Sequence, residues 1–319
     1  MRLSACFVWM IIDMASAQTL SVQMKAVSPE EIRGAGLAND GRLYTWGNGL
    51  HVRDQRLASS TKLASGEFAE GGCLVDLDGD GREEFVGKEG TGLGRLTWRR
   101  PPEWSPEVIG TEFDTHDCLQ ATLFGRTGVL VIQRYMQVRF YEREHGAWKH
   151  RDIYSIYTPS RQTGLSLRDI DGDRRIDIVC GNYWIRSPER FELPWHIFAI
   201  NTWFEDADSA MLAHAFAGPA LVMAQGHLPD ARVAVFQRPA DPRQLWKESR
   251  VAGEFQHVHA VTEWRGRGIF AENNGAASRI FELRDGAAHT IAQGFPVLRL
   301  FPTRGGLISI GPKEIVIWK

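Results

Sequence analysis

The sequence predicts an all-β fold, a β-propeller of seven four-stranded blades that is closed by an N-terminal strand. Residues 76–86, DLDGDGREEFV, and residues 169–179, DIDGDRRIDIV, are two copies of one acidic loop, and each copy runs into a short apolar stretch. The copies begin 93 residues apart, which is two units of about 46, and propeller blades repeat every ~40–50 residues. The 32 Gly and 11 Trp suit many short strands and tight turns.

Strand-like runs separated by turns continue between and beyond the two loops. Residues 116–153 contain four such runs, with a Gly turn at 125–128. Further units start near residues 34, 209, 259 and 296, and the last of them stops after three strands. The segment LSVQMKAV, at residues 20–27, belongs to no other unit. We expect it to complete the last blade, because closure of the ring removes the exposed sheet edges.

The composition excludes several classes of protein. Hydrophobic residues make up 43% of the chain, charged residues make up 24%, and the formal net charge is -2. These values are typical of a globular protein, and they disfavour nucleic-acid binding, which usually needs a basic surplus. No segment has the ~20 apolar residues that a membrane span requires. We expect a monomer.

The N-terminus has the features of a secretory signal. Arg2 precedes a short apolar core, and the small residues ASA at 15–17 fit a cleavage site, although Asp13 lies near the core. We expect a signal peptide at 1–17, a single propeller domain at 18–319, and a secreted or periplasmic protein. A buried N-terminal strand or anchor is the alternative. Three cysteines remain in the mature chain, each in an apolar run, and we expect three buried thiols rather than a disulfide.

The acidic loops are predicted to bind Ca²⁺. Carboxylates occupy loop positions one, three, five and nine, and Ca²⁺ takes ~6–8 oxygen ligands from a flexible cage. The backbone carbonyl at position seven adds an oxygen. The predicted ligands are Asp76, Asp78, Asp80, Arg82 and Glu84 in the first loop, and Asp169, Asp171, Asp173, Arg175 and Asp177 in the second. A solvated acidic turn without an ion is the alternative.

The loops differ from an EF-hand and from each other. Position twelve is Gly87 or Cys180 instead of the bidentate Glu of an EF-hand, and strand-like runs flank both loops. Each loop should therefore join two strands of a hairpin. Gly81 suits a left-handed turn at position six, where the second copy has Arg174. Because a non-Gly residue in this conformation costs about 1 kcal/mol or more, we expect a weaker second site or a different turn.

The two loops and the runs after them resemble the FG-GAP/VCBS repeat, the blade unit of integrin α-subunit propellers and of many secreted bacterial proteins. The resemblance covers residues 66–98 and 160–188 and implies Ca²⁺ binding in the first hairpin of a blade. Glu84 replaces the usual Asp, Arg174 replaces the usual Gly, and the other units lack the acidic loop. The resemblance therefore implies two calcium sites.

The face opposite the acidic loops is the predicted ligand face. The connections between second and third strands meet there, together with the starts of the first strands. Their polar side chains suit a carbohydrate or a protein ligand, although loops are also polar because they are wet. The candidate ligand-binding residues are Lys88, Arg134, Asn182, Tyr183, Gln225, His227, Glu272 and Asn273.

An enzymatic role is the alternative to ligand binding. In His257-x-His259, strand alternation would place both imidazoles on one face, where His116 or Glu263 would complete a transition-metal site. Histidine beside Asp117 or Glu272 would otherwise serve as a general base. Some sugar lyases and dehydratases use similar propellers, which is a fold-level analogy. The candidate catalytic residues are therefore His257, His259, His116 and Asp117.

Overall fold

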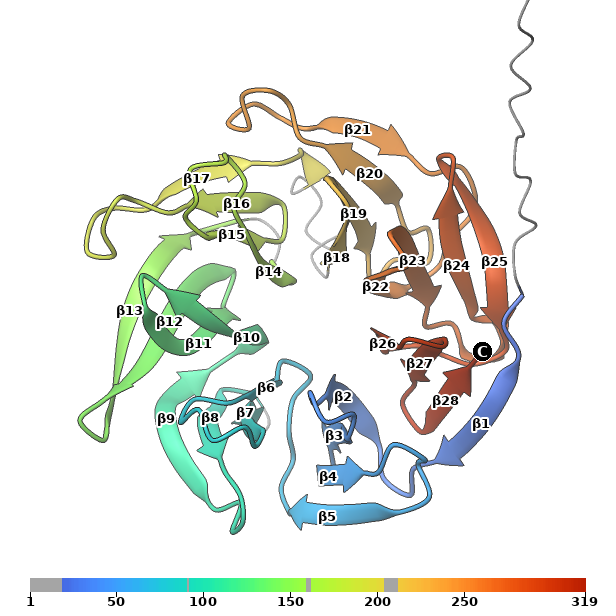
Figure 1. Cartoon of the computed structure of the whole chain (residues 1–319), viewed down its shortest axis with the longest axis horizontal. Helices are drawn as coiled ribbons and strands as arrows, with labels where there is room; N and C mark the ends of the chain where they lie inside the picture. The colour runs from blue at the N-terminus through green and yellow to red at the C-terminus, as the bar shows by residue number, and fades with distance from the viewer. Residues whose placement is uncertain (1–18, 91, 159–161, 204–211) are drawn as a thin grey trace, which may run out of the picture.

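Seven four-stranded antiparallel sheets form a closed ring around a central axis (Figure 1). The computed structural model describes residues 19–90, 92–158, 162–203 and 212–319. The predicted signal peptide, residues 1–17, lies outside the described residues. The ring confirms the predicted all-β propeller with seven blades.

Each blade is a meander of four strands that runs outward from the axis. Blade 1 consists of β2 (Ile32–Leu37), β3 (Leu43–Gly47), β4 (Gly49–Arg53) and β5 (Ser60–Ala64). Blade 2 consists of β6 (Cys73–Val75), β7 (Glu84–Glu89), β8 (Gly94–Arg99) and β9 (Pro106–Phe113). Blade 3 consists of β10 (Thr115–Leu123), β11 (Arg126–Gln133), β12 (Met136–Glu144) and β13 (Ala147–Ile156).

The remaining blades repeat this order. Blade 4 consists of β14 (Leu165–Arg168), β15 (Asp177–Cys180), β16 (Tyr183–Arg186) and β17 (His196–Ala199). Blade 5 consists of β18 (Leu212–Ala217), β19 (Ala220–Gln225), β20 (Val233–Gln237) and β21 (Lys247–Arg250). Blade 6 consists of β22 (Val258–Trp264), β23 (Arg267–Glu272), β24 (Arg279–Arg284) and β25 (Ala287–Gln293). Blade 7 contains β26 (Arg299–Pro302), β27 (Leu307–Ile310) and β28 (Glu314–Trp318).

The N-terminal strand β1 (Val22–Val27) closes the ring. It pairs antiparallel with β28, with Lys25 opposite Val316 and Val27 opposite Glu314. It is therefore the fourth strand of blade 7, as the sequence predicts, and the two ends of the described chain lie side by side (Figure 1).

The hydrophobic core lies between neighbouring blades rather than within one sheet. One cluster joins Val86 and Trp98 of blade 2 to Val131 and Tyr141 of blade 3, and each of these side chains is at most 2% exposed. Second strands such as β19 are buried on both faces, whereas the outermost strand β21 is exposed throughout. Burial on both faces explains why the second strands read as continuous apolar runs.

Helical structure is sparse among the residues that the structure describes. The 3-10 helix η2 (Gly275–Ala277) has three residues and lies between β23 and β24. Within the described ranges, no helix has the length and apolar character needed to cross a bilayer.

The meander gives the ring two distinct faces. Both acidic loops connect a first strand to a second strand, β6 to β7 and β14 to β15, so they share one face. The turns from second to third strands lie on the opposite face, where the first strands also begin. This arrangement is the one that the sequence predicts, and no helix flanks either acidic loop.

Candidate functional site

The first acidic loop gathers three carboxylates. Asp76, Asp78 and Asp80 each contribute an oxygen, and these oxygens lie within 4.8 Å of one another. The backbone holds the arrangement, because Asp76 accepts a hydrogen bond from the Gly81 amide at 3.1 Å. Gly81 adopts the predicted left-handed conformation, with φ of 78°.

Two buried oxygens in this loop accept no hydrogen bond from the described residues. They are Oδ1 of Asp76 and Oε1 of Glu84. Buried carboxylate oxygens normally have partners, since leaving one without a partner costs free energy. Oxygen atoms are the ligands that Ca²⁺ prefers, so the residues present fit this ion.

The carboxylate at loop position nine anchors each loop to its blade. Glu84 is 1% exposed and accepts hydrogen bonds from Trp98 Nε1 at 2.9 Å and the Leu77 amide at 3.1 Å. Asp177 is fully buried and accepts the amides of Ile170 and Ser187 at 2.9 and 2.8 Å. Burial raises the pKa of both carboxyls to about 6.

The second acidic loop gathers a different set of acids. Oxygens of Asp169, Asp171 and Asp177 lie within 4.8 Å of one another, and Asp173 is not among them. Asp173 instead accepts hydrogen bonds from the Arg175 guanidinium and, at 3.2 Å, from Arg186. The matching pair in the first loop is Arg82 with Asp80, at 2.7 Å.

Arg186 distinguishes the second loop from the first. Its Nε donates to Oδ2 of Asp171 at 2.5 Å, so a guanidinium already neutralises one of the three gathered carboxylates. Phe85 and Ile178 occupy the same position in the two blades, and they pair with Arg99 and Ile185 respectively. The residue of blade 2 that is equivalent to Arg186 is therefore Arg100. Arg100 lies 5.1 Å from the Trp98 ring instead.

Backbone strain also differs between the loops. Arg174 adopts a φ of 70° at position six, the left-handed conformation that Gly81 takes in the first loop. The fold therefore imposes the same turn on both copies, and the non-Gly residue carries the conformational cost expected from the sequence.

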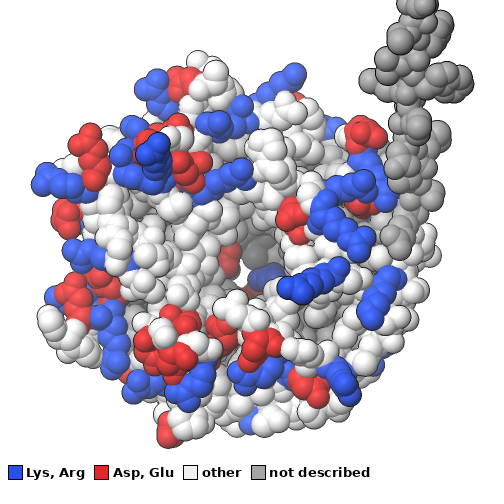
Figure 2. Space-filling model, in the orientation of Figure 1, with Lys and Arg blue, Asp and Glu red and all other residues white. Residues whose placement is uncertain are grey.

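A cavity of about 170 Å³ lies at the axis on the opposite face. Figure 2 shows that the ring is open at its centre, with acidic and basic side chains around the opening. Blades 2 to 7 all contribute to the lining. The ionisable side chains in it are Glu70, His116, Asp117, His214, His227, His259 and Arg299.

Two histidines of this lining contact each other. The rings of His227 and His259 have centroids 4.5 Å apart and lie nearly perpendicular. Burial lowers the pKa of His227. The pKa of His259 is lowered to about 4, mainly by burial and to a smaller extent by the neighbouring His227. Both imidazoles are therefore neutral at pH 7, and each offers one donor and one acceptor.

The charged groups of the cavity are already compensated. Arg299 Nη1 lies 3.0 Å from Oε1 of Glu70. Asp117 accepts the amides of Cys118 at 2.9 Å and Leu165 at 3.1 Å, and burial raises its pKa to about 6. His116 Nε2 lies 2.7 Å from the Arg134 carbonyl oxygen. The cavity is thus polar, without a large net charge.

Three of the four predicted catalytic residues, His116, Asp117 and His259, lie together in this cavity, whereas His257 does not. His257 has a φ of 47°, and a bulge follows between Val258 and Ala260. Regular strand alternation is therefore interrupted at the start of β22, but His257 lies close enough to His227 and His259 to help lower the pKa of both. The placement of both imidazoles of His257-x-His259 on one face stays a prediction. Glu263 lies near the other end of β22 and accepts a hydrogen bond from the Gly266 amide.

The predicted ligand-binding residues fall into two groups. Lys88, Asn182, Gln225 and Glu272 are at most 7% exposed. Some of them pair within the protein, as when Glu272 pairs with Arg279 of β24 at 2.7 Å. Arg134, Tyr183, His227 and Asn273 are at least partly exposed on the predicted face. Of all eight, His227 lines the axial cavity.

Glu70, His214 and Arg299 are cavity residues that the sequence did not suggest. Glu70 lies just before β6, and Arg299 begins β26. His214 lies within β18, and its Nε2 is 2.9 Å from Ser166 Oγ. Glu70 and Arg299 could have been found from the sequence, because both lie at the start of a first strand and first strands begin at the axis.

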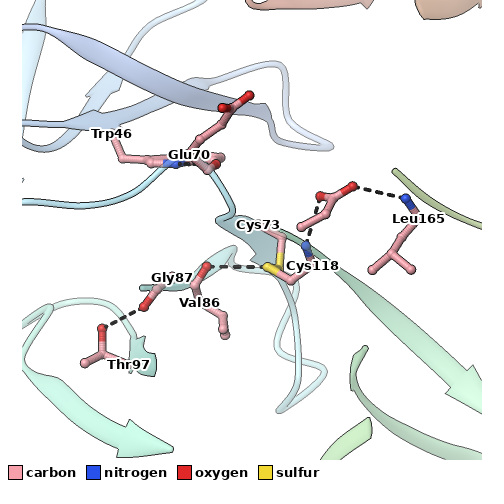
Figure 3. The surroundings of a disulfide bond; sticks show 9 residues. Trp46, Glu70, Cys73, Val86, Gly87, Thr97, Cys118 and Leu165 are labelled. Carbon is pink, nitrogen blue, oxygen red and sulfur yellow. Dashed lines mark hydrogen bonds between the residues drawn. A yellow bond between two sulfur atoms is a disulfide. The ribbon is translucent and has the colours of Figure 1, made fainter. Parts of the chain in front are cut away.

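The structure corrects the prediction for the cysteines. Cys73 of β6 and Cys118 of β10 form a disulfide between blades 2 and 3 (Figure 3). Cys180 is a free buried thiol. The sequence placed all three in apolar strands, but only the packing of neighbouring first strands reveals the 5.6 Å Cα–Cα distance. That distance is ordinary for a disulfide.

The comparisons with solved structures identify the chain as similar to known propellers. The β-propeller domain of Cps50 (Swd1) from Myceliophteria thermophila has a TM-score of 0.62 and 11% identity, covering 94% of this chain and 99% of that chain. A chain of the mitotic checkpoint complex has a TM-score of 0.60 and 13% identity, covering 100% and 97%. No family model and no curated protein matches this sequence. At these identities the likeness shows the fold alone.

Proposed function

We propose that this chain is a secreted, calcium-stabilised β-propeller of the FG-GAP/VCBS type that binds a ligand, best a carbohydrate, on the face of the axial cavity. The observation that carries the binding proposal is the cavity itself, which collects neutral imidazoles and paired charges from six blades. Hydroxyl groups need donors and acceptors together, and these side chains supply both.

Calcium binding is proposed for both acidic loops. Three clustered carboxylates in each loop repel one another unless a cation is bound, and Asp76 has a buried oxygen without a partner among the described residues. The Cys73–Cys118 disulfide supports an exported protein, because disulfides persist in oxidising compartments.

Removal of calcium should lower the melting temperature. An ion present at a hundredfold excess over its dissociation constant stabilises the folded state by about 2.7 kcal/mol. We expect EDTA to lower the melting temperature of the wild type, and Asp76→Ala to remove most of the response at the first loop. Differential scanning calorimetry in Ca²⁺ and in EDTA measures both effects. Asp54→Ala, which removes an exposed acid of the β4–β5 turn in blade 1, is the control. Identical melting curves in Ca²⁺ and EDTA would contradict calcium binding.

A glycan array probed with the purified protein tests ligand binding. His227→Ala and His259→Ala should abolish binding of any glycan that the wild type retains. A protein ligand is the other form of this proposal. The mitotic checkpoint complex, an assembly that contains a similar propeller, gives it only fold-level support.

A sugar lyase or dehydratase is the second candidate, favoured by the pair of neutral imidazoles at the axis. A general base works best with a pKa near the working pH, and a pKa of about 4 makes His259 a weak base at pH 7. The predicted transition-metal site has no support, since the only clusters of three metal-ligating groups among the described residues are the acidic loops. Formation of unsaturated product from an acidic polysaccharide would establish the enzyme.

A further inference from the structure

An exposed pair of aromatic rings lies on blade 3, on the same face as the axial cavity. In the hairpin of β12 and β13, Met136 pairs with Ile156. The residues one step beyond this pair are Tyr135, in the two-residue turn before β12, and Tyr157, directly after β13. Their ring centroids are 4.7 Å apart and the rings are inclined by 55°. The strand register therefore brings the two phenols together.

These rings face solvent. Tyr135 is 46% exposed and Tyr157 is 73% exposed, although large aromatic side chains usually bury most of their surface. With Arg134, Gln137 and Ser155 they line a cleft of about 170 Å³. Arg134 and Ser155 are exposed, and the Arg134 guanidinium makes no hydrogen bond or ion pair with the described part of the chain. The cleft thus combines aromatic faces with donors that are not engaged within the protein.

The cleft and the axial cavity share a wall. His116, which lines the cavity, has its Nε2 2.7 Å from the carbonyl oxygen of Arg134, which lines the cleft. On the other side, the Tyr135 carbonyl accepts the amide of Gln162, the neighbour of the cavity residue Thr163, at 2.8 Å. The two depressions are therefore neighbours, separated by the Arg134–Tyr135 turn and by Gln162.

The chemistry of the cleft favours a sugar over a protein surface. A protein interface buries about 800 Å² per partner around an apolar centre. The exposed apolar side chains of this cleft are limited to Tyr135, Ile156 and Tyr157. A pyranose ring has an apolar C–H face that stacks on a phenol and hydroxyl groups that accept hydrogen bonds from a guanidinium. A depression of this volume is suited to one or two sugar units.

We infer that the Tyr135–Tyr157 cleft is a second sugar subsite, so that the ligand of this propeller is an oligosaccharide that spans the cleft and the axial cavity. The inference rests on the proposed carbohydrate binding. It assigns length selectivity to blade 3, because a monosaccharide fills one depression and a longer chain fills both.

Isothermal titration calorimetry with defined sugars tests the inference. The probes are cellohexaose, mannohexaose and a galacturonate hexasaccharide, each beside its monosaccharide. We expect at least one hexasaccharide to bind more tightly than its monosaccharide, and Tyr157→Ala to weaken that binding about tenfold while monosaccharide binding stays unchanged. Tyr157→Phe should retain most of the affinity. Leu93→Ala, which removes an exposed apolar side chain from the turn between β7 and β8 on the same face, is the matched control. Circular dichroism melts verify that the variants are folded.

Two results would overturn the inference, and they are distinguishable. If a hexasaccharide and its monosaccharide bind equally well and Tyr157→Ala changes neither, the cleft is not a subsite but carbohydrate binding stands. If the wild type binds none of these probes or any glycan of the array, carbohydrate binding itself fails and the inference fails with it.

Discussion

One side chain sets the two acidic loops apart at the scale of single residues. Both loops gather three carboxylates, but Arg186 donates a hydrogen bond to Asp171, whereas the equivalent Arg100 lies over the Trp98 ring. A cation that enters the second loop competes with this guanidinium. The two proposed calcium sites should therefore differ in affinity, in the direction expected from the strained Arg174.

Replacement of Arg186 should strengthen the proposed calcium site in the second loop. A partly exposed ion pair is worth about 1 kcal/mol, so Arg186→Gln should tighten Ca²⁺ binding at that loop about fivefold and leave the first loop unchanged. Calcium titration calorimetry of the wild type, Arg186→Gln and the control Arg100→Gln measures both sites. Equal affinities in all three proteins would refute this role for Arg186.

Asp117 should make stability depend on pH. Burial raises the pKa of this carboxyl from 3.8 to about 6, although Arg299 opposes the shift. The pKa of Asp117 is higher in the folded state than in the unfolded chain, so the folded state favours the protonated carboxyl. The contribution of Asp117 to stability is therefore fully present below about pH 4 and is lost as the pH rises through about 6. The difference between the folded and unfolded pKa of this carboxyl corresponds to at most ~3 kcal/mol in the free energy of unfolding.

The variant Asp117→Asn removes this titration. As the pH rises from about 4 to 7, the free energy of unfolding of the wild type should fall by up to ~3 kcal/mol relative to that of the variant. Urea denaturation at both pH values measures the difference. A gap between the two proteins that does not change with pH would show that Asp117 does not titrate in this range.

The first strands of neighbouring blades couple at the scale of elements. The Cys73–Cys118 disulfide joins β6 to β10, and Asp117 accepts the Leu165 amide at the start of β14. The side chain of Gln120 in β10 also exchanges hydrogen bonds of 2.7 and 3.0 Å with the backbone of Asp76. The first acidic loop is therefore held by blade 3 as well as by its own hairpin.

Loss of the disulfide should destabilise the ring. The two cysteines are 45 residues apart in the sequence, and cross-linking a loop of this length restricts the unfolded chain by about 4 kcal/mol. We expect the double variant Cys73→Ser, Cys118→Ser to lose stability of this order in guanidinium denaturation. Cys180→Ala, which removes a thiol without breaking a cross-link, is the control. Peptide mapping under non-reducing conditions should recover Cys73 and Cys118 as one linked pair, and two free thiols there would disprove the cross-link.

Closure of the ring is a property of the whole molecule. β1 supplies the outer strand of blade 7 and covers the edge of β28, and the amide of Lys319 bonds to the Ser21 carbonyl at 3.0 Å. An uncovered strand edge promotes aggregation and leaves backbone groups unpaired. The N-terminal strand is thus required by the last blade, although nearly the entire chain separates them.

Removal of β1 should open the ring. A chain that begins at Pro29 should melt lower by on the order of 10 °C, because several kcal/mol of strand pairing and packing are lost. A chain that begins at Thr19 keeps β1 and serves as the control. Thermal melts by circular dichroism compare the two chains, and analytical ultracentrifugation detects the expected association through the exposed edge of β28. Equal melting temperatures would refute the role of β1 in closure.

The sequence by itself determined the features that depend on local spacing. Acidic loops between strands, seven repeated units and an unclaimed N-terminal strand follow from residues close together in the chain, and the structure confirms them. Only the tertiary structure decided which side chains meet across blades. The disulfide, the Glu70–Arg299 pair and the contact between His227 and His259 depend on blade packing. Contacts between distant segments depend on how the sheets pack, and no local pattern encodes that geometry.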